Sequence, residues 1–226
     1  MFWQDKEGDS ENFVVPDDIV DVLFSIDCRS LPCDHAYALS TAVLQVLPWL
    51  ADESLAGIHL IHGAESGAGW VRPEDVIVLS RRNKLTLRLP KERIKDAEKL
   101  VGKTLDISGN NLIIGKTSIR KLSKLKTIFS RYIVYSACEN EADFLKFISE
   151  ELQKKAIEVN KIMPGKMHEL KTPNEVLRCR SIMISDLTAM QSVQIQTEGI
   201  GKGRKLGCGI FLPHKGIDTI APMEKD

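Results

Sequence analysis

The sequence predicts an α+β protein made of two units with the same order of elements, and three observations lead to this fold class. Short stretches rich in β-branched and aromatic residues alternate with amphipathic helical stretches. The order strand, helix, strand pair, helix, strand occurs between residues 19 and 114 and again between residues 125 and 213. A glycine-rich stretch joins the last helix to the last strand. This order is that of two tandem ferredoxin-like (RRM-like, βαββαβ) domains with a C-terminal glycine-rich loop.

A chain of 226 residues is long enough for two domains of about a hundred residues each. We place the boundary near Lys116, which gives an N-terminal domain of residues 1–116 and a C-terminal domain of residues 117–226. The sequence contains no literal repeat, so this division depends on the order of elements alone.

The first unit begins with a strand at Ile19–Ile26, which is rich in β-branched residues. Asp34 is a good N-cap for the helix that follows, whose apolar stripe stops before Pro48. The remaining elements are strands at Ile58–His62 and Val76–Leu79 around the glycine-containing turn of residues 63–69, a strand at Lys84–Pro90, a helix from Pro90 to Leu100 and a strand at Leu105–Ile114. In Lys84–Pro90 the residues alternate, which predicts leucines on one face and Lys84, Thr86 and Arg88 on the other.

The second unit shows the same order without sequence similarity to the first. Its predicted elements are a strand at Leu125–Ala137, a helix at Glu141–Ala156, a strand pair at Val159–Leu170 and Val176–Ile184 around Pro164-Gly165, a helix at Ser185–Glu198 and a strand at Cys208–Pro213.

The glycine-rich loop is the most unusual stretch of the chain. Five of the fifteen glycines lie within residues 199–209, namely Gly199, Gly201, Gly203, Gly207 and Gly209. Glycine is kept where the backbone needs a positive φ or approaches another group closely. Lys202, Arg204 and Lys205 stand between these glycines, so backbone N–H groups and cations would share one surface. Such a surface suits an extended anion such as a phosphate chain.

The position of this loop argues against a nucleotide-cofactor site. Walker and dinucleotide loops follow a strand and open a helix, whereas this loop follows a helix and leads into a strand. Two other interpretations stay open, a mobile glycine-rich connection and a regulatory nucleotide-binding loop.

The formal net charge of zero conceals a segregation of charge along the chain. Residues 1–80 hold 3 basic and 14 acidic residues, whereas residues 81–131 hold 15 basic and 4 acidic residues. The basic stretch predicts a surface that follows phosphates, with Arg81, Arg82, Lys84 and Arg88 at its start. The alternatives are solvated helix faces and mutual neutralisation of the two halves. Because aromatic residues make up only 6% of the chain, stacking of bases on an exposed sheet is disfavoured.

Composition also limits the cellular setting. The sequence shows neither a signal peptide nor an apolar segment of membrane-spanning length, so we expect no membrane association. Its five scattered cysteines indicate a reducing, cytoplasmic location without a metal cluster. We expect neither a metal nor another cofactor.

His35 is the leading candidate for catalysis. It lies at the start of the first predicted helix, beside Asp34, where opposing influences on its pKa suit proton transfer near neutrality. Tyr37 and Arg29 are close in sequence and could position a phosphate. The alternative is a structural histidine. If Ile58–His62 is a strand, His59 and His62 lie on opposite faces and cannot share a metal. His214 follows the glycine loop beside Lys215 and could touch a ligand, the alternative being an exposed histidine at a strand end, whereas His168 has no evident partner in the sequence.

Three stretches together carry a family resemblance: Leu31–Leu39 with its Asp-His-Ala-Tyr, Leu79–Pro90, and residues 199–217 with the Gly-Cys-Gly-Ile-Phe-Leu-Pro-His-Lys-Gly-Ile ending. On these motifs the chain resembles the Cas six family of CRISPR-associated repeat-RNA endoribonucleases, within the RAMP superfamily, and is most similar to its I-MYXAN subtype. A glycine loop between a helix and a strand near the C-terminus is the mark of that family.

The resemblance implies tandem ferredoxin-like domains and metal-independent cleavage of CRISPR precursor RNA within the repeat. The 2′-hydroxyl of the RNA would attack the adjacent phosphate and leave a 2′,3′-cyclic phosphate and a 5′-hydroxyl. His35 would be the general base or acid, the glycine loop would hold RNA backbone, and Arg81 and Arg82 would add to the basic surface. The helix after His35 lacks the lysine that the family often places there. The partners implied are the precursor and mature guide RNA, with other CRISPR-associated effector subunits as further candidates. An inactive RNA-binding subunit of an effector complex is the alternative function.

Overall fold

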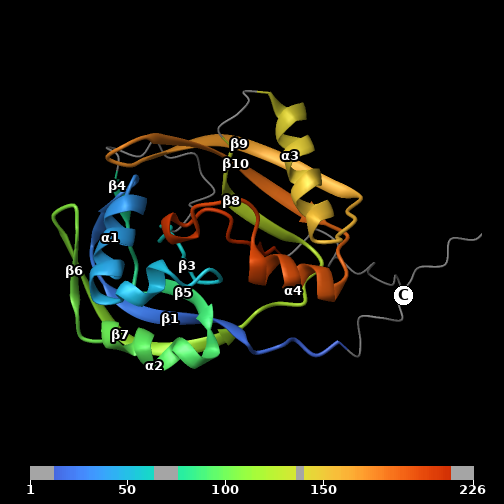
Figure 1. The fold of residues 1–226 in the computed structure, drawn as a ribbon. Helices are drawn as coiled ribbons and strands as arrows, with labels where there is room; N and C mark the ends of the chain where they lie inside the picture. The colour runs from blue at the N-terminus through green and yellow to red at the C-terminus, as the bar shows by residue number, and fades with distance from the viewer. Residues whose placement is uncertain (1–12, 64–75, 136–139, 215–226) are drawn as a thin grey trace, which may run out of the picture.

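The computed structural model describes residues 13–63, 76–135 and 140–214, and two antiparallel sheets dominate them (Figure 1). A five-stranded sheet has the strand order β3-β5-β1-β7-β6, and a four-stranded sheet has the order β11-β8-β10-β9. If the edge strand β6 is left out and the first sheet is read in reverse, its order β7-β1-β5-β3 corresponds to β11-β8-β10-β9 in the second sheet. In both sheets the first strand of the unit, β1 or β8, lies inside the sheet. Both halves therefore have the strand order of a ferredoxin-like unit, as the sequence predicts.

The five-stranded sheet is built around β1, which pairs with β5 on one side and with β7 on the other. Its strands are β1 (Ile19–Asp27), β3 (Gly57–Ile58), β5 (Lys84–Pro90), β6 (Thr104–Ile107) and β7 (Asn110–Lys121). The helical elements of this half are α1 (Ala36–Val46), η2 (Pro48–Ala51), η3 (Lys91–Arg93), α2 (Ile94–Ala97) and η4 (Glu98–Leu100).

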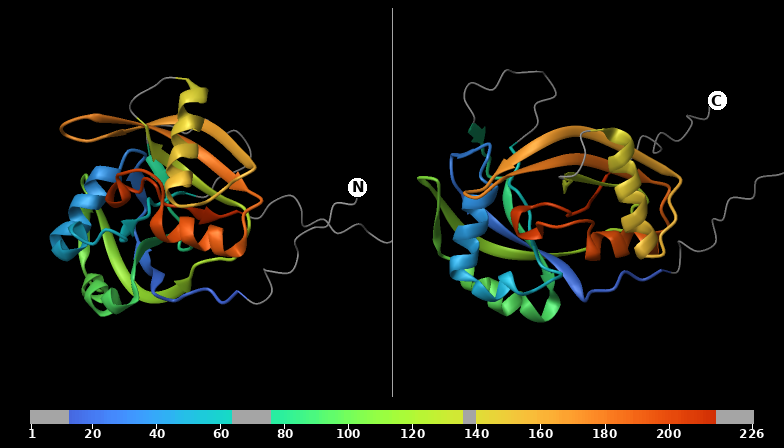
Figure 2. Two further views of the ribbon diagram at one scale, coloured as in Figure 1. Left: turned by 45° about the vertical axis from the view of Figure 1, so that its right-hand side comes forward. Right: turned by 45° about the horizontal axis from the view of Figure 1, so that its top comes forward.

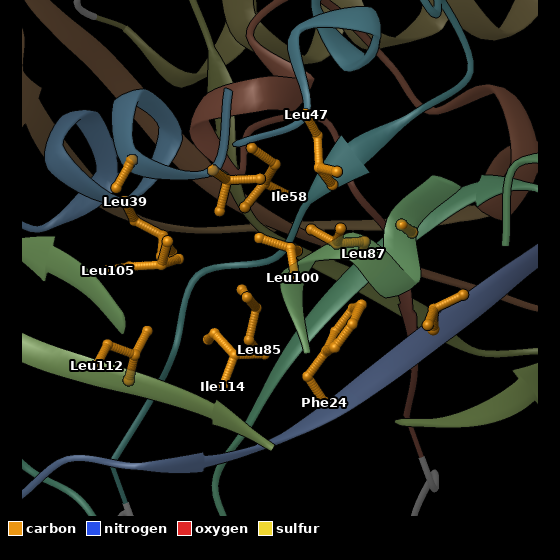
Figure 3. Close-up of a cluster of buried hydrophobic side chains, with 14 of the residues drawn as sticks. Phe24, Leu39, Leu47, Ile58, Leu85, Leu87, Leu100, Leu105, Leu112 and Ile114 are labelled. Atoms are coloured by element: carbon orange, nitrogen blue, oxygen red, sulfur yellow. The ribbon is translucent and has the colours of Figure 1, made fainter. Parts of the chain in front are cut away.

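The core of this half lies between the sheet and its helices. Its side chains come from the leucine face of β5, the inward face of β1, the stripe of α1 and the β6–β7 hairpin. Figure 3 shows part of this core, in which the labelled side chains are Phe24, Leu39, Leu47, Ile58, Leu85, Leu87, Leu100, Leu105, Leu112 and Ile114. Because alternate residues of β5 point into this core, the predicted leucine face is confirmed.

The four-stranded sheet has β8 and β10 at its centre and two helices against one face. Its elements are β8 (Ile128–Val134), α3 (Glu141–Lys154), β9 (Lys161–Lys171), β10 (Val176–Ser185), α4 (Ala189–Glu198), η5 (Arg204–Leu206) and β11 (Leu212–Pro213). Phe144, Ile148 and Leu152 of α3 pack with Ile182 and Ile184 of β10 in a second core. Thr188 and Gln191 form a capping box that sets the start of α4.

The glycine-rich loop of residues 199–211 lies between the two halves (Figure 2). In both views of Figure 2 this red segment runs between the blue-to-green part of the ribbon and the long orange β9–β10 hairpin. The loop therefore meets both sheets, a position that the sequence alone did not indicate. The division of the chain at residue 116 stays a prediction; β7 runs through that position.

Some predicted strand pairings were wrong. Val76–Val78 forms β4, but it pairs with β2 (Ser30–Pro32) in a small separate sheet, while β3 pairs with β5. The predicted strand at Ile58–His62 has only its first residue in β3, and most of the turn predicted at residues 63–69 falls outside the described residues. The short strand β2 was missed because three residues between a turn and a helix carry almost no periodic signal.

Two corrections concern the second half. The β9–β10 hairpin turns at residues 172–175, where Thr172 and Glu175 close the loop with hydrogen bonds. Pro164-Gly165 lies inside β9 instead, beside the irregularity between Arg180 and Ile182 of β10, which is where sheets tolerate such residues. The last strand is limited to Leu212–Pro213 because residues 199–211 belong to the glycine-rich loop.

Among the residues that the structure describes, every helix is too short or too polar to cross a lipid bilayer.

Candidate active site between the two sheets

The glycines of the loop are required by its backbone. Gly199, Gly201, Gly203, Gly207 and Gly209 all have positive φ values, between 66° and 87°. A side chain is strained in this region of conformational space, so the prediction that these glycines serve unusual backbone geometry is confirmed.

Two of the three loop cations hold the loop onto the first half rather than facing solvent. The guanidinium of Arg204 is nearly buried and donates to the carbonyls of Leu55 and Thr197 at 2.9 and 3.0 Å. Lys205 Nζ donates to the carbonyls of Glu53 and Ala56 at 2.6 and 2.7 Å. These hydrogen bonds attach the loop to the first half, while Lys205 stays partly exposed. The RNA-binding roles expected of Arg204 and Lys205 remain predictions. Lys202 is exposed and stays available to a phosphate.

Arg88 was predicted to bind RNA, but it is buried with no exposed surface. Its guanidinium donates to both carboxylate oxygens of Asp21, and to the carbonyls of Gln196 and Phe211. The alternation of β5 does place Arg88 on the face opposite the leucines. That face is covered by the end of α4 and the return of the glycine-rich loop, so Arg88 joins the two halves. Arg81, Arg82 and Lys84, which flank the turn before β5, are exposed as an RNA surface would require.

His35 lies in the interior, with an exposed fraction of 1%. It is the N-cap of α1, and its side chain makes no capping bond. Its Nδ1 lies 2.8 Å from the carbonyl oxygen of Pro32, and its Nε2 lies 3.2 Å from the backbone nitrogen of Ile61. Because a carbonyl accepts and a backbone N–H donates, the ring is neutral with its proton on Nδ1. Burial also lowers the pKa of His35, despite the carbonyls of Pro32 and Cys33 that favour the charged form.

The prediction that Asp34 caps the first helix was wrong. Helix α1 begins one residue later than this cap requires, and the carboxylate of Asp34 accepts a hydrogen bond from the backbone N–H of Lys171 in β9. Asp34 thereby connects the β2–α1 turn to the second half of the molecule and brings β9 close to His35.

A cleft of about 380 Å³ opens where these segments meet. Residues of the β2–α1 turn, of the segment after β3, and of β8 and β9 contribute to it, so both halves form its walls. Its polar lining residues include Asp34, His35, His62, Arg131, Tyr132 and His168. Tyr37 is exposed on α1 and Arg29 is exposed in the β1–β2 turn, and neither lines this cleft. Of the three residues predicted to be catalytic, the structure places His35 alone in the cleft lining.

Two further histidines meet at one tyrosine in this cleft. The ring of His62 stacks on Tyr132 with the centroids 6.3 Å apart, and the ring of His168 meets Tyr132 edge to face at 5.2 Å. All three side chains are partly exposed. The glycine-rich loop contacts the backbone at Tyr132, because the backbone N–H of Gly209 donates to the Tyr132 carbonyl at 2.7 Å. Two imidazoles on either side of a phenol can donate and accept protons within one small volume.

The cleft lining carries charges of both signs, with Arg131 as a cation and Asp34 and Glu169 as carboxylates. Burial lowers the pKa of His168, and the nearby cations Arg131 and Lys166 lower it further. Burial raises the pKa of Tyr132, so its hydroxyl keeps its proton at neutral pH. The cleft therefore offers a ligand one cation at Arg131, an imidazole at His168 whose pKa is lowered, and a phenol at Tyr132 that can donate a hydrogen bond.

Sequence patterns did not indicate that His62, Tyr132 and His168 come together. His62, Tyr132 and His168 come from three distant segments, and each is an isolated polar residue in or beside a strand. The expectation that His59 and His62 lie on opposite faces of a strand does not apply, because β3 ends at Ile58. His59 is buried 3.5 Å from Asp21, and His62 lines the cleft. The partner of His168 became visible only when β8 and β9 took their places in the sheet.

The comparisons with known proteins agree with this architecture. The model of the family described as Cas6 Crispr matches residues 20–216. A curated protein of Myxococcus xanthus (strain DK1622), named CRISPR-associated endonuclease Cas6, is 27% identical over 194 residues, which cover 86% of this chain and 81% of that protein.

Solved structures show the same fold at low sequence identity. A structure titled CRISPR associated protein Cas6 superposes with a TM-score of 0.61 at 13% identity and covers 87% of this chain and 100% of that chain. A second, titled an RAMP protein binding different RNA substrates, has a TM-score of 0.59 at 13% identity and covers 85% of this chain and 98% of that chain. The chain therefore shares the fold of these two structures. Since the family model spans most of the sequence, the chain belongs to the Cas6 family.

Proposed function

We propose that this protein is an endoribonuclease that cleaves CRISPR precursor RNA within the repeat, in the cleft between its two sheets. Membership of the Cas6 family supports this reaction class, and the curated relative carries the name endonuclease. The observation that carries the proposal is the gathering of His35, His62, Tyr132 and His168 with Arg131 at one cleft that both halves form. Proton-transfer groups and a cation thus stand together at a site large enough for a nucleotide.

The proposed chemistry uses the 2′-hydroxyl of the RNA as nucleophile. Because nucleophile and phosphate belong to the same molecule, their effective concentration is already high, and neither a metal-bound water nor a covalent intermediate is needed. The protein then has to align the 2′-oxygen with the phosphate, take one proton and supply another. Such acid–base assistance is worth about 10²–10⁴-fold in rate. The products are a 2′,3′-cyclic phosphate and a 5′-hydroxyl.

Binding of the RNA uses surfaces outside the cleft. The exposed cations at the start of β5 and in the turn before it are Arg81, Arg82 and Lys84. Lys202 is exposed in the glycine-rich loop. These cations contact phosphates, which position RNA but do not themselves specify its sequence. The bound ligand is the repeat RNA, before and after the cut.

The first test uses end-labelled repeat RNA with the protein in EDTA at low salt. We expect one cut inside the repeat and an upstream product whose mass and resistance to phosphatase indicate a cyclic phosphate. Tight binding without a cut would contradict the nuclease and indicate an RNA-binding subunit of an effector complex. An absence of binding would contradict both functions.

A further inference from the structure

We propose that Cys179 and Cys208 form a redox-sensitive pair, and that their oxidation to a disulfide fixes the glycine-rich loop to the second sheet and slows the cleavage of RNA. Cys179 lies in β10, and Cys208 lies in the loop between Gly207 and Gly209. The covalent step does not depend on what the protein does. Its effect on cleavage rests on the proposed ribonuclease function.

The two thiols are free and buried side by side. Cys179 has an exposed fraction of 2% and Cys208 of 0%, and both belong to one apolar cluster. Val134 of β8 adjoins both: it pairs with Cys179 across the sheet, and like the Cys208 sulfur it lies 3.5 Å from the place of a Cβ on Gly203. The Cys208 thiol donates to the sulfur of Cys179, which in turn donates to the carbonyl of Leu177 at 3.8 Å. Hydrogen-bonded sulfurs need only a short approach to reach the S–S bond length of about 2.0 Å.

The hydrogen bond between the thiols makes the two sulfurs unequal. It lowers the pKa of the Cys179 thiol, and together with burial it raises the pKa of the Cys208 thiol. The thiolate is the form that reacts with an oxidant. Cys179 is therefore the sulfur that is oxidised first, and Cys208 supplies the thiol that closes the disulfide.

The cleft between the two sheets gives an oxidant a route to this pair. His168 lies directly opposite Cys179 on the neighbouring strand, and it lines the cleft. Leu170 belongs both to the cleft lining and to the apolar cluster that contains the two cysteines. The pair thus lies directly behind one wall of the cleft, where a molecule as small as hydrogen peroxide can reach it.

The reaction balances with hydrogen peroxide as the oxidant. The Cys179 thiolate attacks one peroxide oxygen and the O–O bond breaks, which gives a sulfenic acid and a hydroxide that becomes water with the proton of the thiol. The sulfur of Cys208 then forms the S–S bond and displaces the hydroxyl group, which leaves with the Cys208 proton as a second water. The two sulfurs together lose two electrons, and the two peroxide oxygens gain them.

The disulfide would connect the glycine-rich loop covalently to the second half of the molecule. In the reduced protein Arg204 and Lys205 attach this loop to the first half through backbone carbonyls. A bond between Cys208 and β10 attaches the same short segment to the second sheet. Oxidation therefore restricts how the two halves can move relative to one another.

The same bond would displace one wall of the cleft. Cys179 is the direct neighbour of His168, and Cys208 precedes Gly209, whose N–H donates to the carbonyl of Tyr132. Closing the S–S bond draws the two cysteines together, so the cleft residues that adjoin them move as well. A displacement of about 1 Å at a reaction site can cost about 10²-fold in rate.

Treatment of the full-length protein with hydrogen peroxide tests the covalent step. The oxidised protein should be about 2 Da lighter, from the loss of two hydrogens, and Cys179 and Cys208 should resist alkylation until dithiothreitol is added. Its melting temperature should rise by about 5–10 °C, because the disulfide closes a loop in the unfolded chain. Two thiols that stay open to alkylation in the unfolded protein after this treatment would overturn the proposal.

Single-turnover cleavage of repeat RNA tests the functional step. Oxidised wild-type protein should cut at least tenfold more slowly than reduced protein, and dithiothreitol should restore the rate. Cys208→Ala and Cys179→Ala cannot form the bond, so peroxide should leave the rate of each variant at its own untreated value. Cys28→Ala is the matched control, because this partly buried thiol donates to the carbonyl of Ser30 and should not affect the response.

The outcomes separate this inference from the function on which it rests. A response to peroxide that persists in Cys208→Ala and disappears in Cys33→Ser would assign the effect to the thiol in the cleft lining and overturn the pair. If the reduced wild-type protein leaves the RNA intact, the proposed function fails, while the mass and the alkylation pattern still decide whether the disulfide forms.

Discussion

Replacing Arg88 with methionine should lower the free energy of unfolding by about 3–5 kcal/mol, the usual cost of breaking a buried ion pair from one side. The change leaves the carboxylate of Asp21 in the interior, and it removes the donor of the Gln196 and Phe211 carbonyls. Burial by itself would raise the pKa of Asp21, but Arg88 and His59 hold it well below its ordinary value. Denaturant unfolding at pH 7 measures the loss.

Arg120→Met provides the matched control, since Arg120 donates to the same carboxylate at 3.0 Å from the other neighbouring strand. Its side chain is 52% exposed, so its loss should cost about 1 kcal/mol or less. If both variants lose the same free energy of unfolding, the Asp21 carboxylate is stabilised by the total positive charge around it. The buried contact of Arg88 that joins the two halves would then have no special role.

The pH dependence of the free energy of unfolding is a second test of the contact between Arg88 and Asp21. A carboxylate with a depressed folded-state pKa contributes stability above its unfolded value of about 3.8, and this contribution is lost as pH falls through the folded value. Arg88→Met removes the strongest attractive partner and so raises the pKa of Asp21 in the folded protein. The variant should therefore begin to unfold in acid at a higher pH than the wild type.

Gly199→Ala should destabilise the protein by about 2–5 kcal/mol, through strain at its backbone angles and overlap of the new methyl group. Gly199 has φ 72° and ψ −173°, a region that glycine alone occupies readily. An added Cβ would also overlap the carbonyl oxygen of Gly209 and the guanidinium of Arg204. That carbonyl accepts from the N–H of Ile200, so neither side of the loop can move away without losing a hydrogen bond.

Gly109→Ala is the control without steric overlap, because Gly109 also has a positive φ, of 83°, but open space around the position of its Cβ. It should cost about 1–2 kcal/mol, the usual penalty of a positive φ for a residue with a side chain. Melting curves of the two variants and of wild type give the comparison. A Gly199→Ala protein as stable as the Gly109→Ala protein would show that the loop is not packed as described.

The helices and strands that could be predicted from the sequence are those whose apolar residues are spaced so that they face a single core. The leucines of β5 and the stripes of α1 and α3 each face one core, so their spacing indicated both the element and its buried side. The other face of β5 could not be predicted in this way. Arg88 looks like a surface residue in the sequence, and it is buried because a segment more than a hundred positions later covers it.

The candidate site shows the same limit. The sequence singled out His35 from its position at a helix start, and the structure does place it at the cleft. Its hydrogen bonds to Pro32 and Ile61, however, depend on where the chain returns after β3. The same holds for Lys205, whose charge suggested a phosphate but whose neighbours are the carbonyls of Glu53 and Ala56. Charge and residue type were visible, whereas the partners came only with the tertiary fold.

A repeat RNA that carries a single 2′-deoxy substitution at the nucleotide before the cut tests whether the 2′-hydroxyl is the nucleophile. We expect the protein to bind this RNA as tightly as the unmodified RNA and to leave it intact at that position, because the nucleophile has been removed. Cleavage of the substituted RNA at the same bond and a comparable rate would contradict attack by the 2′-hydroxyl and with it the proposed chemistry of the cleft.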